Sequence, residues 1–115
     1  MVEYTYQQKI AIMRVLLDTI HADGRIDARE TFYYNQLKDQ LGLKDKDHEH
    51  VNEKGSLLAL TQISKFNCKQ KEYLSELMSR MIVVDEEIHV NEIEVYRVVC
   101  KACDIKTDFR DPTKP

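Results

Sequence analysis

Apolar residues recur along the first part of the chain at steps of three and four residues, the spacing of one face of an α-helix. Between about Glu3 and Ala22 this stripe consists of Tyr6, Ile10, Met13, Leu16, Leu17 and Ile20. Gly24 can adopt the left-handed backbone that ends a helix, so a turn is expected at Asp23–Ile26. No segment alternates apolar and polar residues as a half-buried strand does, and we predict an all-α fold.

A second helix is expected directly after this turn. Asp27 is a favoured N-cap residue, and Glu30 three positions later completes a capping box in front of a helix that reaches about Leu41. Gly42 follows as a helix-ending residue. The polar segment Lys44–Gly55 then predicts a surface connection with room for a short helix.

Three further helices are predicted in the rest of the chain. A brief buried helix begins at Ser56, with the serine as its N-cap. Asn67 with Gln70 forms another capping signature and opens a helix over about 68–84. The last helix is expected over Val90 to Ala102.

The segment Ile20–Glu30 returns in relaxed form as Ile82–Glu92. The offset between equivalent residues is constant, because 85 − 23 and 92 − 30 both give 62. The correspondence extends to both sides and pairs Ile12 with Leu74, Leu16 with Met78, Ile20 with Ile82, Tyr34 with Tyr96, Leu37 with Val99, Leu41 with Cys103 and Leu43 with Ile105. We therefore predict two related helix–turn–helix halves, each with Asp-x-x-Ile-x-x-x-Glu across its turn, within a domain of about five to seven helices.

The totals support a single small domain. A chain of 115 residues suits one hydrophobic core, and we expect a helical domain at 1–105 followed by a flexible tail at 106–115.

A net charge of −3 without a basic stripe argues against nucleic acid as a partner. No apolar run approaches the roughly 20 residues of a membrane span. Three cysteines, an odd number, do not form a disulfide framework. Together with the lack of a membrane-spanning run, this predicts a cytoplasmic protein without membrane insertion.

The duplicated turn brings acidic residues into equivalent places. If the halves pack about a pseudo-twofold axis, Asp23, Glu30, Asp85 and Glu92 could converge. Such carboxylates repel one another unless protons, basic side chains or a cation neutralise them. Oxygen ligands favour Ca²⁺, Mg²⁺ or Mn²⁺, whereas a nitrogen from His89 would move the preference toward Zn²⁺.

The competing interpretation is purely structural. Asp27 and Glu30 form a capping box, and acids in the first turn of a helix gain about 0.3–1 kcal/mol from its dipole. This explanation is weaker for the second half, where His89 replaces Asp27 and leaves Glu92 without an obvious capping partner other than Asn91. An EF-hand is excluded, because the loop that would begin at Asp23 lacks the required oxygen ligands and central glycine.

The cysteines give a weaker signal. Cys100 and Cys103 form a CxxC on a predicted helix, with no second pair to complete a zinc site. The 62-residue offset makes Cys103 equivalent to Leu41, which predicts a core position for Cys103. It makes Cys100 equivalent to Lys38, which predicts partial exposure of Cys100. A redox or metal role for the pair stays open. Cys68 opens a helix, where a thiol pKa can fall, but no His or Asp adjoins it.

Two longer motifs carry a family resemblance. H-A-D-G-R-I-D-A-R-E followed by L-x-x-x-L-G-L, and V-D-E-E-I-H-V-N-E followed by C-D-I, resemble the TerB-like tellurite-resistance family over about residues 8–105. The resemblance implies a compact helical domain of two related halves, associated with tellurite and stress resistance and found in membrane-tethered co-chaperones. By position it implicates Asp23, Asp27, Glu30, Asp85 and Glu92 in binding a divalent metal, while His89 stands in place of an acid.

The expected function follows from these two arguments. We predict a non-enzymatic TerB-like protein that binds a divalent cation through Asp23, Asp27, Glu30, Asp85, His89 and Glu92 and acts in tellurite, metal or stress response. The alternative is a metal-free adaptor or co-chaperone-like module that docks a protein partner. A third interpretation, an enzyme with paired carboxylates as acid and base, would need a concave pocket beside Glu30 and Glu92.

Overall fold

The computed structural model describes residues 2–22, 24, 27–84 and 90–106. Within these ranges it contains six α-helices, one short 3₁₀-helix and no strand, which confirms the all-α prediction. The elements are α1 (Tyr6–Ile20), α2 (Ala28–Gln40), η1 (Asp45–Asp47), α3 (His48–Glu53), α4 (Ser56–Ser64), α5 (Cys68–Val83) and α6 (Val90–Ala102). None of these helices is long and apolar enough to cross a membrane.

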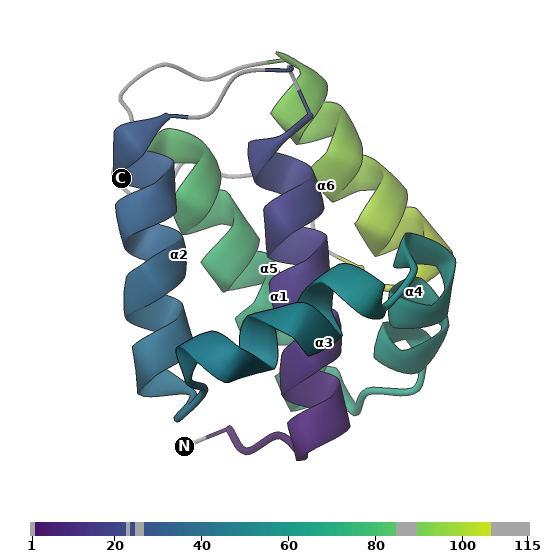
Figure 1. The fold of residues 1–115 in the computed structure, drawn as a ribbon. Coiled ribbons are helices and arrows are strands. Elements are labelled where there is room, and N and C mark those ends of the chain that lie inside the picture. The colour runs from purple at the N-terminus through teal and green to yellow at the C-terminus, as the bar shows by residue number, and fades with distance from the viewer. Residues whose placement is uncertain (1, 23, 25–26, 85–89, 107–115) are drawn as a thin grey trace.

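The four longest helices form two hairpins that pack together. Helix α1 contacts α2, α5 and α6, and α5 contacts α1, α2 and α6. This pattern is unchanged when α1 is exchanged with α5 and α2 with α6, as a pseudo-twofold axis requires. Figure 1 shows α1 and α5 running in the same direction, so that their ends and the beginnings of α2 and α6 lie at one end of the molecule.

Helix boundaries repeat at the offset of 62 residues found in the sequence. Helix α6 coincides with α2 after this shift, and α1 and α5 begin at equivalent positions. The caps repeat as well: Thr5 and Gln8 form a capping box at the start of α1, and Asn67 and Gln70 form the equivalent box at α5. Because Thr5 holds the N-cap, the first helix begins at Tyr6 and not at Glu3 as expected.

The ends of α2 and α6 are also equivalent. The backbone N–H of Leu43 donates to Lys38 at 3.0 Å, and that of Ile105 donates to Cys100 at 2.8 Å. Between them, Gly42 and Asp104 both have a positive φ, at 76° and 56°. The two helical hairpins therefore share their helix starts, the capping boxes of α1 and α5 and the turns after α2 and α6. These shared features are the structural basis for the predicted duplication.

The segment between the hairpins differs from its prediction in two details. Gly55, and not Ser56, is the N-cap of α4, because the Ser56 hydroxyl donates at 2.6 Å to Asp18 of α1. The connection before it is not wholly at the surface, since α3 packs on α1 and buries Val51. Helix α4 packs against α1 and α6 and so covers one side of the bundle.

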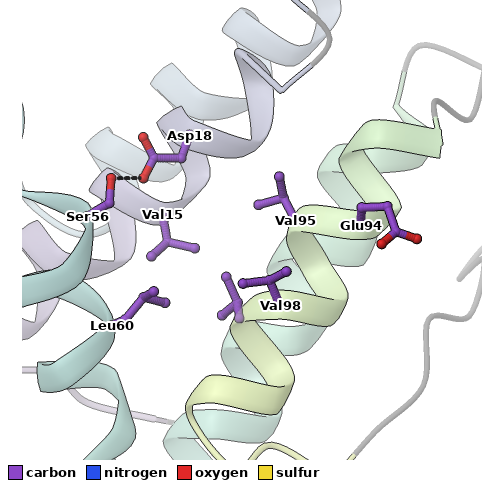
Figure 2. A pocket seen from close by; sticks show the side chains of 8 residues that line it. Val15, Asp18, Ser56, Leu60, Glu94, Val95 and Val98 are labelled. Carbon is purple, nitrogen blue, oxygen red and sulfur yellow. Dashed lines mark hydrogen bonds between the residues drawn. The ribbon is translucent and has the colours of Figure 1, made fainter.

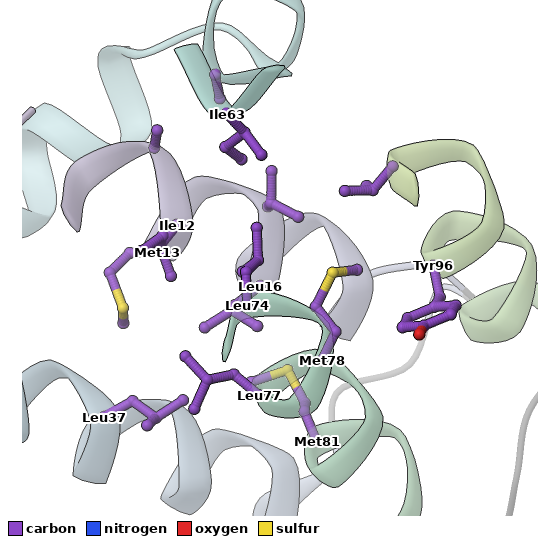
Figure 3. Packing of buried hydrophobic residues seen from close by; sticks show 14 of the residues in the cluster. Ile12, Met13, Leu16, Leu37, Ile63, Leu74, Leu77, Met78, Met81 and Tyr96 are labelled. Carbon is purple, nitrogen blue, oxygen red and sulfur yellow. The ribbon is translucent and has the colours of Figure 1, made fainter. Parts of the chain in front are cut away.

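The core lies between α1 and α5 and is closed by the other helices (Figure 3). The stripe predicted for α1 is confirmed at Ile10, Met13, Leu16 and Ile20, whereas Leu17 is only partly buried and Tyr6, at 42% exposure, was wrongly assigned to the core. Several equivalent positions of the two halves are buried alike. The pairs include Ile12 with Leu74, Leu16 with Met78, Ile20 with Ile82 and Tyr34 with Tyr96. The expected tail falls almost entirely at 107–115, outside the described residues.

Candidate cation site at the paired acidic turns

The feature that links the two halves chemically is a pair of buried glutamates. Glu30 is the third residue of α2 and Glu92 the third residue of α6. Their exposed fractions are 2% and 0%. Since α2 and α6 begin at the same end of the molecule (Figure 1), the structure brings the two glutamates to one end, in equivalent places about the pseudo-twofold axis.

Burial of a carboxylate is costly unless other groups compensate for the lost water. Each glutamate sits in the first turn of its helix, where the exposed backbone N–H groups and the helix dipole favour negative charge. Both residues also interact with other groups of the protein. The site therefore combines two buried carboxyl groups with helix N-termini that favour negative charge.

Asp27 is the N-cap of α2 as predicted, but the predicted capping box is not formed, because the Glu30 side chain does not return a hydrogen bond to the Asp27 backbone. Its Oδ1 accepts hydrogen bonds from the backbone N–H groups of Arg29 at 2.8 Å and Glu30 at 3.2 Å. The Arg29 Nε lies 3.8 Å from the same oxygen. Asp27 thus caps α2 and fixes the first turn that carries Glu30, so that we assign it a positioning role.

The remaining predicted ligands, Asp23, Asp85 and His89, lie outside the described residues. In the part of the chain that the structure describes, no group of three or more His, Cys, Asp or Glu side chains is arranged to hold a metal ion. The described part of the candidate site therefore consists of Glu30 and Glu92, with Asp27 holding one of them in place.

Sequence reasoning identified Glu30 and Glu92 but missed that both are buried. The signal was present, because Glu30 precedes Tyr34 by four residues and Leu37 by seven, which puts it on the apolar stripe of α2. In α6, Glu92 bears the same relation to Tyr96 and Val99. A glutamate on the core-facing stripe is unlike an ordinary capping residue, which points along the surface.

Tyr34 forms the next layer beneath Glu30 on α2. Burial raises the pKa of its phenol to about 12, although the Arg14 guanidinium acts in the opposite direction. The His48 ring lies edge-on to the tyrosine, with 6.4 Å between ring centroids. An unionised phenol below the acidic end adds no further negative charge there.

The cysteines form no part of this site. Cys103 is buried as predicted; its thiol donates to the Leu60 carbonyl at 3.4 Å, and burial raises its pKa to about 11. Cys100 is also buried, at 6% exposure, so the prediction of partial exposure is wrong. It shares the inward face of α6 with Tyr96, which lies four residues earlier. Only Cys68 is exposed among the three free cysteines.

The fold has a counterpart among solved structures. The chain is similar to a protein of unknown function from Porphyromonas gingivalis W83, whose crystal structure matches with a TM-score of 0.78. The two sequences are 16% identical, and the match covers 96% of this chain and 87% of that one. No protein-family model and no curated protein matches the sequence. At this identity the similarity concerns the fold alone.

Proposed function

We propose that the protein is a non-enzymatic, cytoplasmic TerB-like domain that binds a divalent cation between its two acidic turns. In this role it would serve in tellurite, metal or stress response. The observation that carries the proposal is the burial of two glutamates at equivalent positions, Glu30 and Glu92, at the same end of the molecule.

The proposed ligands divide into two groups. Glu30 and Glu92 supply carboxylates from the helices, and Asp23, Asp85 and His89 supply the remaining donors from the two turns. Asp27 holds the first turn of α2 in place. A set of carboxylates favours Ca²⁺, Mg²⁺ or Mn²⁺, and participation of His89 would favour Zn²⁺.

The electrostatic argument favours a cation over an anion or a neutral ligand. Two carboxylates that approach each other in a poorly solvated place are destabilising, and a divalent ion between them removes that repulsion. A cation shared by both halves would also account for the same residue type at the same place in each half.

Thermal melting in the presence of Ca²⁺, Mg²⁺, Mn²⁺, Zn²⁺ or EDTA tests the proposal. A ligand that binds only the folded state stabilises it by about 2.7 kcal/mol at a concentration of 100 times its Kd. We expect one of these ions to raise Tm in the wild type, and Glu30→Gln and Glu92→Gln each to lose that increase. The matched control is Glu76→Gln, an exposed glutamate of α5, which should keep it.

An unchanged Tm with every ion at millimolar concentration would contradict the proposal. The same holds if the glutamine variants retain the full increase, because the ion would then bind elsewhere. Since glutamine keeps the size of glutamate and removes its charge, a loss in these variants reports on the charge and not on packing.

The metal-free interaction module is the second candidate. It is favoured by Phe32, whose side chain is 66% exposed in the second turn of α2, beside the acidic end. Exposed aromatic residues are frequent anchors of protein interfaces. Recovery of one partner from cell extract by the wild type but not by Phe32→Ala, with no effect of any ion on Tm, would favour this candidate over cation binding.

A further inference from the structure

A cavity of about 270 Å³ opens between α1, α4 and α6. Almost all of its lining surface is apolar, and its five aliphatic residues are Val15 from α1, Leu60 from α4, and Val95, Val98 and Val99 from α6. Figure 2 shows the side chains of Val15, Leu60, Val95 and Val98 directed toward this space from both sides. The three polar residues of the lining are Asp18, Ser56 and Glu94.

The duplication explains why this cavity exists. After a shift of 62 residues, Val95 of α6 corresponds to Tyr33 of α2. Tyr33 is partly buried against the core and lies close enough to Tyr73 and Arg80 of α5 for their charges to act on its phenol. An aromatic side chain therefore occupies the α2–α5 interface at the position where the α1–α6 interface has only a valine. The space that remains is bounded by α4, which crosses on that side.

The charged residues at the cavity are already compensated within the protein. Asp18 accepts from Arg14 at 2.7 Å and, through its other carboxylate oxygen, from Ser56 at 2.6 Å. Glu94 accepts from Arg97 at 3.1 Å, and in Figure 2 its carboxylate points away from the cavity. Neither acid is therefore placed to select a charged group of a ligand, and the surface that a ligand would meet is hydrocarbon.

From this geometry we infer a binding site for the neutral aliphatic chain of a small molecule, whose polar end would remain in solvent. The volume lies just below the range of about 300–1,000 Å³ usual for ligand pockets, so the bound portion is small, the size of a short chain. Burial of such a chain against valine and leucine removes apolar surface from water on both sides. The site uses none of the residues of the proposed cation site, and the two proposals stand or fall separately.

Methyl-detected NMR titration with straight-chain primary alcohols, from butanol to octanol, tests this inference. We expect saturable shifts at the methyl groups of Val15, Leu60, Val95, Val98 and Val99. Each added methylene should tighten binding about fourfold until the cavity is filled. Val95→Tyr, which supplies the residue type found at the equivalent position, should abolish the saturable shifts, whereas Val90→Tyr, on an exposed position of the same helix, should not.

Several outcomes would overturn the inference. Shifts that remain linear to the solubility limit, or that appear equally at the exposed Leu57 and Leu58, indicate nonspecific association. Octylamine or octanoate binding more than about tenfold tighter than octanol would contradict a neutral site. If Val95→Tyr does not give a folded spectrum, Val98→Phe is used in its place. Val98 borders the cavity and is 57% exposed, so a larger side chain can be accommodated there. Unchanged alcohol binding by Val98→Phe would also contradict the inference.

Discussion

Gln8 and Gln70, which are 62 residues apart, meet across the molecule: the side-chain amide of Gln70 donates to Oε1 of Gln8 at 3.3 Å. Each glutamine also closes the capping box of its own helix. Equivalent residues of a duplicated unit can contact each other only where they lie beside the pseudo-twofold axis. This contact therefore locates the axis at the beginnings of α1 and α5, at the opposite end of these helices from the acidic turns (Figure 1).

The equivalence of the two caps leads to a prediction about stability. Thr5→Ala and Asn67→Ala each remove the side chain that accepts from an N3 backbone N–H, of Gln8 at 3.2 Å and of Gln70 at 2.8 Å. Each substitution should lower the free energy of unfolding by about 1 kcal/mol, measured by urea denaturation. Thr61→Ala is the control, since Thr61 is an exposed residue within α4 and should change stability by less than about 0.5 kcal/mol.

Two tyrosine substitutions should have opposite effects. The Tyr34 hydroxyl is buried and has no hydrogen-bond partner among the described residues, so Tyr34→Phe should raise the free energy of unfolding by about 1 kcal/mol. The Tyr4 hydroxyl donates to the Gln70 carbonyl at 2.9 Å, so Tyr4→Phe should lower it by about the same amount. Urea denaturation measures both changes. An equal decrease in the free energy of unfolding in the two variants would show that the Tyr34 hydroxyl is hydrogen-bonded in solution.

Stability should fall at alkaline pH. Burial raises the pKa of Tyr33 and of Tyr34 from 10.0 to about 12 in the folded protein. The unfolded chain therefore loses these protons first, and the stabilisation is complete below pH 10 and is lost between about pH 10 and pH 12. For Tyr34, which is 5% exposed, the loss amounts to roughly 2–3 kcal/mol.

Urea denaturation at a series of alkaline pH values measures this loss. Tyr34→Phe serves as the control, because it removes one of the titrating groups and should make the decline less steep. A free energy of unfolding that is independent of pH across this range would mean that both phenols ionise as easily in the folded protein as in the unfolded chain.

The local signals in the sequence predicted much of the fold. The Asn67–Gln70 pair fixed the start of α5, and the residues of α6 were predicted as observed. Caps and apolar spacing depend on a few neighbouring residues, so they can be recognised without knowledge of packing. The start of α4 could not be predicted in this way, because Ser56 is used by Asp18 of another helix.

The candidate site was predicted less completely. Its location at one end of the molecule followed from the duplication, whereas the burial of Glu30 and Glu92 did not, since an acid at that helix position is normally explained by capping. The aliphatic cavity was also missed, because it depends on the path of α4 across α1 and α6. Comparison of the two halves position by position would have indicated it, since a valine, Val95, stands where the first half has Tyr33. The TerB-like resemblance and the metal ligands remain predictions.

Paramagnetic broadening by Mn²⁺ in a two-dimensional amide NMR spectrum tests the central claim, a single cation held by both acidic turns. Substoichiometric Mn²⁺ should broaden the amide signals of Ala28–Thr31 and of Val90–Ile93 together, and should spare Gln8 and Gln70 at the other end of the bundle. Broadening at the beginning of α2 or of α6 alone, or at neither, would contradict a shared site.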